Sequence, residues 1–157
     1  MASKELKIGD KAPSFDMPTD GSGTVSLSSL AGRNVVLYFY PKDDTSGCTK
    51  EACDFRDSLP NFGRIDAAVV GVSRDSVASH DKFKEKHTLP FALASDADGK
   101  TSEAYGTWVE KSMYGRKYMG MERATFLIDG KGVIRGIWRK VKVPGHVAAV
   151  LQAAKAL

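Results

Sequence analysis

The stretch from residue 34 to residue 60 constrains the fold more than any other part of the chain. Residues 34–40 form a short apolar run rich in β-branched and aromatic residues, which predicts a buried strand. Pro41 ends this strand, and the polar residues 42–47 are typical of a turn. The order strand, turn and then helix is a common building block of α/β proteins.

The helix that follows is expected to begin near Thr45 or Ser46, either of which can serve as its N-cap. Ser58 and Pro60 are expected to end it. These limits place Cys48 in the first turn of a helix that follows a central strand.

That position has a chemical consequence for Cys48. The first-turn amide N–H groups have no partner within the helix and carry the positive end of its dipole. They stabilise a thiolate, so the thiol pKa falls and the nucleophilic fraction at neutral pH rises. Cys53, the second of two cysteines, lies five residues later. The alternative is a buried structural thiol beside an incidental one, but the strand, proline and turn before Cys48 favour a reactive cysteine.

The pattern Pro41-x-x-x-Thr45-x-x-Cys48 resembles the active-site motif of the peroxiredoxins, which are thiol-dependent peroxidases of the thioredoxin superfamily. The surrounding residues 39–53 resemble the subgroup called bacterioferritin comigratory protein or peroxiredoxin Q. The similarity extends from Gly9 to the last helix. The resemblance therefore implies a peroxidase that reduces hydrogen peroxide and organic hydroperoxides.

The resemblance also assigns roles to particular residues. Cys48 would be the nucleophile, and the Thr45 hydroxyl would accept from the peroxide or donate to the thiolate. Pro41 would fix the backbone and shield the pocket from water. Arg123 matches the family's arginine that donates to the sulfur and to the peroxide, and a planar guanidinium can reach two oxygens at once. Glu51 could orient Arg123 by an ion pair, although a surface helical glutamate is the commoner case.

Recycling follows from the same resemblance. Attack leaves Cys48 as a sulfenic acid, which condenses with a nearby thiol. Many members of the subgroup carry a resolving cysteine five residues on, where this chain has Cys53. Thioredoxin or a similar dithiol would then reduce the disulfide. No metal or organic cofactor is required, and His80, His87 and His146 have no zinc spacing with the cysteines.

The rest of the chain alternates strand and helix signals. A second buried strand is expected at 65–73, and because it follows a helix it should lie parallel to the first. A helix capped by Ser73 or Asp75 should follow. The remaining expected elements are a strand at 89–96, a short helix at 101–105, an irregular or hairpin-like segment at 108–121, an antiparallel hairpin at 123–138 and a helix at 144–157.

The order of these elements predicts an α/β fold with helices on both faces of a mixed central sheet. Before residue 34, two short strands around the turn at 20–23 predict an N-terminal β-hairpin. The resemblance identifies the whole as a thioredoxin fold with an N-terminal β-hairpin extension. At 157 residues, the chain is expected to form one domain, residues 1–157.

Composition excludes several classes of protein. It is 42% hydrophobic and 27% charged, as in an ordinary globular protein, and no apolar run approaches a membrane span. Residues 1–10 alternate in charge and show no secretory signal. With two cysteines, this favours the reducing cytoplasm. The net charge of +4 is read as a solvated surface and not as a nucleic-acid site, because interleaved aromatic platforms are missing. The subgroup resemblance implies a monomer.

Two other functions remain open at this point. A thiol–disulfide oxidoreductase of the thioredoxin type needs Cys-x-x-Cys, whereas this chain has Cys48-x4-Cys53. A chaperone-like binding module on a thioredoxin scaffold would need neither cysteine. Consumption of peroxide in the presence of a dithiol distinguishes both from a peroxidase.

Overall fold

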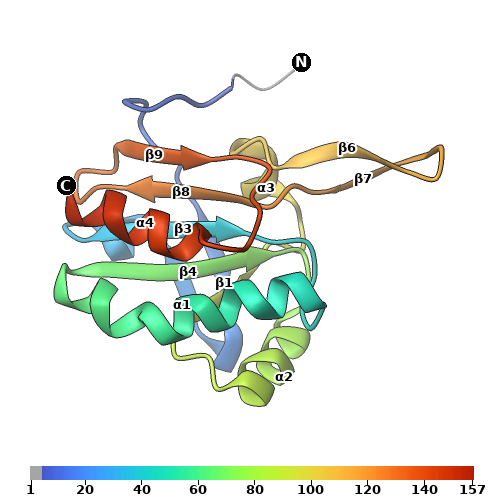
Figure 1. Ribbon diagram of the computed structural model, residues 1–157, viewed down its shortest axis with the longest axis horizontal. Helices are drawn as coiled ribbons and strands as arrows, with labels where there is room; N and C mark the ends of the chain where they lie inside the picture. Colours follow the sequence, from blue (N-terminus) through green and yellow to red (C-terminus); the bar gives the residue numbers. More distant parts are fainter. Residues whose placement is uncertain (1–4) are drawn as a thin grey trace.

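A five-stranded mixed sheet forms the centre of the computed structural model, which describes residues 5–157 (Figure 1). The strand order is β5-β4-β3-β8-β9. Strands β3, β4 and β5 run parallel, and β8 is antiparallel to both β3 and β9. The bounds are β3 Asn34–Phe39, β4 Ala67–Ser73, β5 Ala92–Ser95, β8 Ala124–Ile128 and β9 Ile134–Trp138.

Three helices and their core cover one face of this sheet. They are α1 Ser46–Arg64, α2 Val77–His87 and α4 His146–Lys155. Side chains alternate across β3, so Val36 and Tyr38 join the core beneath these helices. Val35, Leu37 and Phe39 point to the opposite face and join a second core. The central strand is therefore buried on both sides.

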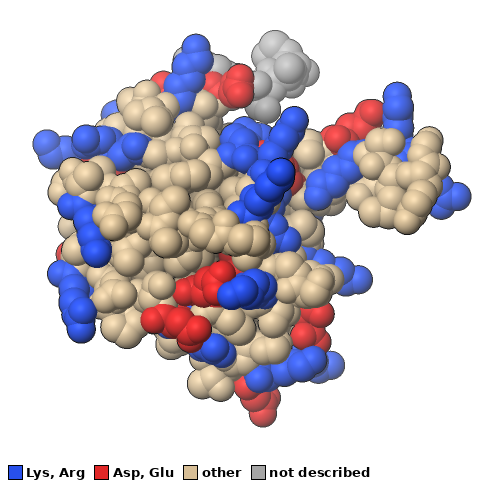
Figure 2. Space-filling model, in the orientation of Figure 1, with Lys and Arg blue, Asp and Glu red and all other residues tan. Residues whose placement is uncertain are grey.

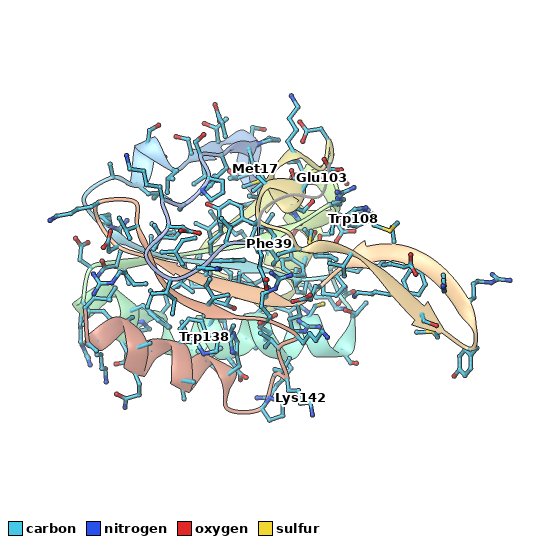
Figure 3. All side chains as sticks on the ribbon, turned by 90° about the horizontal axis from the view of Figure 1, so that it is seen from above. Met17, Phe39, Glu103, Trp108, Trp138 and Lys142 are labelled. Carbon is cyan, nitrogen blue, oxygen red and sulfur yellow. The ribbon has the colours of Figure 1, made fainter. Side chains whose placement is uncertain are left out.

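The N-terminal segment and a short helix cover that opposite face. Strands β1 Asp16–Pro18 and β2 Thr24–Ser26 pair antiparallel around the 3-10 turn η1 Asp20–Ser22, and the 3-10 turn η2 Ser28–Leu30 follows. The helix is α3 Lys100–Ala104. Figure 3 shows Met17 and Glu103 on this side of the sheet and Trp138 on the side of α4. The α/β class, the N-terminal hairpin and the mixed sheet flanked by helices are confirmed.

A two-stranded arm projects from the body (Figure 1). It consists of β6 Trp108–Met113 and β7 Arg116–Met121, which pair antiparallel. Tyr114 and Gly115 form its tip with φ of 53° and 77°, as a two-residue turn with two positive φ values requires. Of the two descriptions that the sequence left open for 108–121, the hairpin is correct.

Pro60 does not end helix α1, contrary to the sequence prediction. The helix continues to Arg64 with Pro60 inside it. Proline removes one helical hydrogen bond, but the apolar face of the helix extends beyond it. Phe62 is fully buried, with its ring centroid 6.0 Å from that of Phe55. We conclude that tertiary packing of Phe62 outweighs the local cost of the proline.

The N-cap of α2 also differs from the prediction. It is Ser76, whose hydroxyl accepts a hydrogen bond from the Ser79 amide, and not Ser73 or Asp75. Within the described residues, no helix is long and apolar enough to cross a bilayer. The predicted absence of a secretory signal concerns residues 1–10, of which residues 1–4 lie outside the described residues.

Candidate active site

Cys48 lies in the first turn of α1, as the sequence predicted. Thr45 occupies the N-cap position with extended backbone angles, and its carbonyl accepts the first helical bond from the Thr49 amide at 2.8 Å. The Cys48 amide therefore belongs to the first turn, where N–H groups have no helical partner. The Cys48 side chain is 2% exposed and its thiol is free. A thiolate at this position lies at the positive end of the longest helix in the described residues.

Arg123 is brought to this thiol by the sheet register. Ala124 pairs with Phe39 across β8 and β3, so the residue before β8 lies beside the loop that leaves β3. The Arg123 Nη2 group donates to Cys48 Sγ at 3.3 Å, and Nη1 donates to Glu51 Oε1 at 2.6 Å. A Cβ on Gly47 would lie 3.2 Å from Nη2, so glycine there lets the guanidinium approach closely. Sequence reasoning overlooked Gly47.

Glu51 is a buried carboxyl group with an unusual environment. Its side chain is fully buried, and Oε2 has no hydrogen-bond partner among the described residues. Burial raises the pKa of Glu51 to about 7, against the opposing effect of the Arg123 charge. Burial alone would lower the pKa of Arg123, but the interactions with Glu51 and Cys48 outweigh burial and raise this pKa. The arginine is therefore held as a cation between a thiol and a carboxyl group.

Two further polar residues lie behind Glu51 and were missed from the sequence. His146 Nε2 lies 3.9 Å from Glu51 Oε2 and 2.7 Å from the hydroxyl of Thr125. Burial, followed by the Arg123 charge, lowers the pKa of His146 to about 4, so this imidazole is neutral at pH 7. The sequence signal that could have pointed to Thr125 is a polar residue inside β8, a strand that is buried along its whole length. His146 and Thr125 therefore add polar groups but no charge to the surroundings of Glu51.

The raised pKa of Glu51 predicts a stability change with pH. The carboxyl group ionises near pH 4.5 in the unfolded chain and near pH 7 in the folded one. The folded state therefore binds more protons between these values, and its contribution to stability falls as pH rises from about 4.5 to about 7. Glu51→Gln should remove this fall, which amounts to roughly 3 kcal/mol. Urea unfolding of the reduced wild type and variant at pH 5 and pH 8 measures it, and an identical change in both proteins would contradict the assignment.

Among the described residues, Thr45 and Pro41 make no hydrogen bond with Arg123 or Glu51. Both residues are exposed. The Thr45 hydroxyl donates to the carbonyl of Lys42 at 2.9 Å. Its hydrogen is thus used inside the loop, which leaves its lone pairs to accept from a bound peroxide. It does not accept from a first-turn amide, so its cap role is limited to its backbone. Pro41 follows β3 as predicted, and its shielding of a pocket stays a prediction.

Cys53 lies on the same uninterrupted helix as Cys48. It is half-buried and its thiol is also free. The helix between the two cysteines carries Glu51, so the segment that separates the two thiols also supplies the partner of Arg123.

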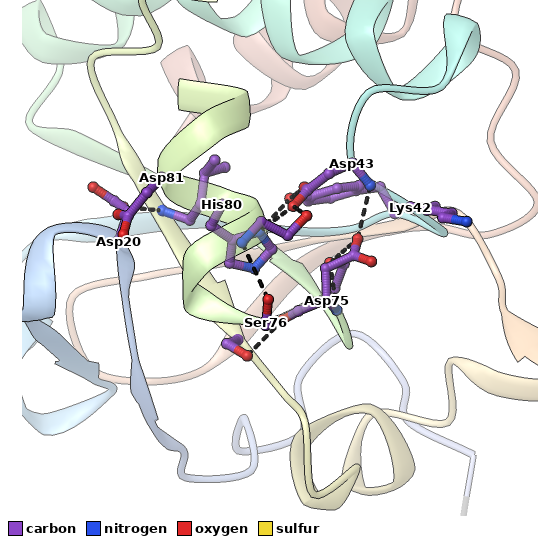
Figure 4. A network of polar contacts seen from close by, with 12 residues as sticks. Asp20, Lys42, Asp43, Asp75, Ser76, His80 and Asp81 are labelled. Atoms are coloured by element: carbon purple, nitrogen blue, oxygen red, sulfur yellow. Dashed lines mark hydrogen bonds and ion pairs between the residues drawn. The ribbon is translucent and has the colours of Figure 1, made fainter. Parts of the chain in front are cut away.

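The loop before Cys48 is fixed to α2 by a buried network (Figure 4). Asp43 Oδ2 lies 2.6 Å from His80 Nδ1, and His80 Nε2 lies 2.9 Å from the carbonyl of Ala94. Asp43 Oδ1 accepts a second hydrogen bond, from the Tyr40 hydroxyl. Both ring nitrogens of His80 face oxygen acceptors, the Asp43 carboxylate and the Ala94 carbonyl, so both must donate. His80 is therefore an imidazolium, and its pKa is raised because Asp43 outweighs the effect of burial. The Asp43 amide donates to Asp75, one of the residues wrongly predicted as a cap.

We expect His80→Gln to destabilise the protein strongly, by about 3–5 kcal/mol, because it leaves the Asp43 carboxylate buried without its cation. His87→Gln is the matched control. His87 lies on the same helix as His80, but its partner, Asp44, is exposed. Such pairs contribute less than about 1 kcal/mol. Urea unfolding at pH 6 compares the two variants, and equal losses of stability would show that the Asp43–His80 pair does not fix the loop.

Comparisons with known proteins identify the family of this chain. The sequence profile of the AhpC/TSA family matches residues 8–137. The chain is 53% identical to peroxiredoxin Bcp of Bacillus subtilis over 150 residues, which cover 96% of each chain. It is 40% identical to peroxiredoxin Bcp of Escherichia coli over 146 residues, which cover 93% of this chain and 94% of the relative.

Solved structures of related proteins have the same fold. The bacterioferritin comigratory protein of Xanthomonas campestris, studied for alkyl peroxide reduction, matches with a TM-score of 0.87, 46% identity and 90% coverage of both chains. A peroxiredoxin Q of Xylella fastidiosa matches with a TM-score of 0.92, 42% identity and 98% coverage of both. The thioredoxin fold is therefore confirmed, and the chain belongs to the AhpC/TSA family, among the peroxiredoxins of the bacterioferritin comigratory protein and peroxiredoxin Q group.

Proposed function

We propose that this peroxiredoxin reduces hydrogen peroxide and organic hydroperoxides to water and alcohols through Cys48, with Cys53 as the resolving thiol and a thioredoxin-type protein as the reductant. The observation that carries the proposal is the Arg123 guanidinium, 3.3 Å from the Cys48 sulfur at the N-terminal end of α1. A cation and free helix amides around one small volume can hold a thiolate and a peroxide together. Organic substrates are supported by the Xanthomonas campestris relative, whose structures concern alkyl peroxide reduction.

In the first step, the Cys48 thiolate attacks one peroxide oxygen, so an S–O bond forms and the O–O bond breaks. The other oxygen leaves as hydroxide or alkoxide and takes a proton from solvent. Negative charge moves from sulfur to the leaving oxygen, and Arg123 can donate to both ends of that path. The Thr45 lone pairs can accept from the attacked oxygen's O–H group, which orients the peroxide in line.

In the second step, Cys53 attacks the sulfur of the Cys48 sulfenic acid, and a disulfide and one water form. An external dithiol then reduces the disulfide by two thiol exchanges and is itself oxidised. These steps use two electrons from the dithiol for each peroxide, so no metal or organic cofactor enters the cycle. In the described residues, no group of three or more His, Cys, Asp and Glu side chains is arranged to hold a metal ion.

Two properties of the protein in the cell belong to the same proposal. We propose that it works as a monomer in the reducing cytoplasm, without nucleic-acid or membrane partners. A reducing compartment supplies the dithiol, and a disulfide that forms and is reduced in each cycle is the kind found there. Sedimentation velocity at micromolar concentrations checks the monomer, and a dimer would contradict it.

A peroxide-consumption assay tests the function directly. Reduced protein with dithiothreitol should consume hydrogen peroxide and cumene hydroperoxide over many turnovers. A thiol–disulfide oxidoreductase would instead reduce the disulfides of insulin without consuming peroxide. A chaperone-like module would do neither. Peroxide consumption no faster than with dithiothreitol alone would refute the proposal.

Arg123→Ala is expected to slow peroxide attack by Cys48 about 100-fold, because one donor to the developing charge is lost. Arg123→Lys should recover only part of this rate, because an ammonium supplies charge without the two-pronged geometry. Stopped-flow oxidation of the reduced protein by peroxide measures the rate. A rate unchanged by Arg123→Ala would remove this arginine from the site.

A further inference from the structure

The arm formed by β6, β7 and their turn, residues 108–121, exposes several large apolar side chains to solvent. Of the six exposed large hydrophobic residues in the described chain, four lie on this arm: Met113, Tyr114, Tyr118 and Met119. Tyr114 is fully exposed and has a positive φ of 53°, which is uncommon for an aromatic residue. An isolated two-stranded hairpin is marginally stable in water. The arm therefore presents apolar surface to solvent away from the core of the protein.

The two faces of the arm differ in charge. Side chains alternate along each strand, and the register pairs Lys111 with Tyr118 and Met113 with Arg116. These residues, with Val109 and Gly120, form one face, whose only charges are positive; we name it the basic face. The opposite face carries Trp108, Glu110, Ser112, Lys117, Met119 and Met121, and we name it the paired face. On the paired face Lys117 lies 3.7 Å from Glu110, so its charges are balanced.

The paired face fixes the arm to the body at its root. The Trp108 ring lies under the Arg74 guanidinium, 3.4 Å from its carbon, and Arg74 donates to Ser102 (Figure 3 labels Trp108). Met121 is buried and accepts from the hydroxyl of Thr107. Six residues in each strand carry the tip about 20 Å from this root. Figure 2 shows the arm standing clear of the body, with uncharged surface at its end, Lys and Arg around it, and acidic surface on one side.

The arm begins close to the active site. The N-terminal end of α1 and the arm lie on the same side of the molecule, where β3 and β4 end (Figure 1). Only Glu122 separates β7 from Arg123. Lys111 is half-buried, and its pKa is lowered by burial and then by the Arg123 charge, with opposing effects from Glu122 and then from Cys48. Lys111 thus lies within electrostatic range of the reacting thiol.

We infer that the basic face of the arm is the docking surface for the protein dithiol that recycles the Cys48–Cys53 disulfide. This inference rests on the proposed function. The partner that fits is a protein whose dithiol lies in an apolar surface with acidic residues at its rim, because Met113 and Tyr118 are flanked by Lys111 and Arg116. A second copy of this chain fits poorly, since a two-fold contact would place the same two cations against each other. Transient redox complexes use small interfaces, which a ribbon face beside the site can supply.

The test uses two matched pairs of variants in the full chain. Arg116→Glu alters the basic face, and Lys117→Glu makes the same charge change at the next residue on the paired face. Met113→Ser and Met119→Ser form the second pair, and both methionines are exposed. Each variant is assayed with dithiothreitol, which needs no docking, and with a bacterial thioredoxin and its reductase.

All four variants should keep wild-type peroxide turnover with dithiothreitol. With thioredoxin, kcat/KM for thioredoxin should fall about tenfold in Arg116→Glu and about fivefold in Met113→Ser. Lys117→Glu and Met119→Ser should stay within about twofold of wild type. Added salt should slow thioredoxin recycling of the wild type more than that of Arg116→Glu.

Equal effects of the two faces, or no effect of either, overturn the inference. A dimer in sedimentation velocity that Arg116→Glu dissociates also overturns it, because a second copy would then occupy the face. If thioredoxin does not recycle the wild type while dithiothreitol does, the assigned partner is wrong and the peroxidase function stands. If dithiothreitol supports no peroxide consumption, the proposed function itself fails.

Discussion

A Cys48→Ser variant is expected to consume no peroxide above background at any concentration of dithiol. The thiolate is the only group of the site that can form the S–O bond, because Arg123 is a cation and Glu51 is a buried carboxyl group bound to it. A serine hydroxyl keeps the shape of the site but does not ionise at neutral pH. The variant should therefore fold normally and keep the Arg123–Glu51 pair.

Cys53→Ser is the matched control on the same helix. It keeps the nucleophile, so it should consume one peroxide per chain rapidly and form a Cys48 sulfenic acid, which a dimedone-type reagent traps. Turnover with thioredoxin should then fall to a small fraction of the wild type, because the intramolecular disulfide cannot form. Rapid peroxide consumption by Cys48→Ser, with Cys53→Ser inactive, would exchange the roles of the two thiols.

Local patterns in the sequence were enough to place Cys48 in the first turn of a helix. A buried strand, a proline, a polar turn and a helix N-terminus lie within one continuous segment, and each has its own signal. The parallel pairing of β3 with β4 and the antiparallel hairpin of β8 and β9 followed from the order of the elements. Arg123 was different, because it lies 75 residues from Cys48. Its place depends on the pairing of β8 with β3, so the resemblance to peroxiredoxins, and not the local pattern, pointed to it.

Long-range contacts explain what the sequence did not reveal. Phe62 carries α1 through Pro60 because its burial depends on a core built from distant elements. His80 lies against Asp43, 37 residues earlier, and no local pattern joins the two. His146 reaches Glu51 only through the packing of α4 against α1. Each of these partners is chosen by tertiary structure, which no local propensity encodes.

Formation of the Cys48–Cys53 disulfide is expected to unwind the start of helix α1. Residues five apart in an α-helix have Cα atoms roughly 8.6 Å apart, whereas a disulfide requires about 4.4–6.8 Å. The reduced structure has an uninterrupted helix across both cysteines. Glu51 lies between them, so unwinding withdraws it from Arg123, and the oxidised chain should lose the arrangement that holds a peroxide.

Two anchors limit how far the unwinding extends. The loop before the helix is held by Asp43 and His80. Beyond Cys53, the Phe55 ring is fully buried and stacks on Tyr38 with ring centroids 4.5 Å apart, and Arg56 donates to the carbonyl of His87. The segment free to rearrange is therefore short, residues 46–54. The unwinding should remain local and leave strand β3 intact.

Hydrogen exchange of the reduced and oxidised proteins measures this rearrangement. The amides of residues 49–54 should exchange at least about 100-fold faster after oxidation, which corresponds to roughly 2.7 kcal/mol of lost protection. Amides of Val35–Phe39 should stay equally protected in both states, because β3 is hydrogen-bonded on both sides. Cys53→Ser treated with one equivalent of peroxide is the control, since it is oxidised but cannot form the disulfide, and its helix should stay protected. Equal protection of residues 49–54 in both redox states of the wild type would exclude the intramolecular bond, and the resolving thiol would then have to come from another molecule.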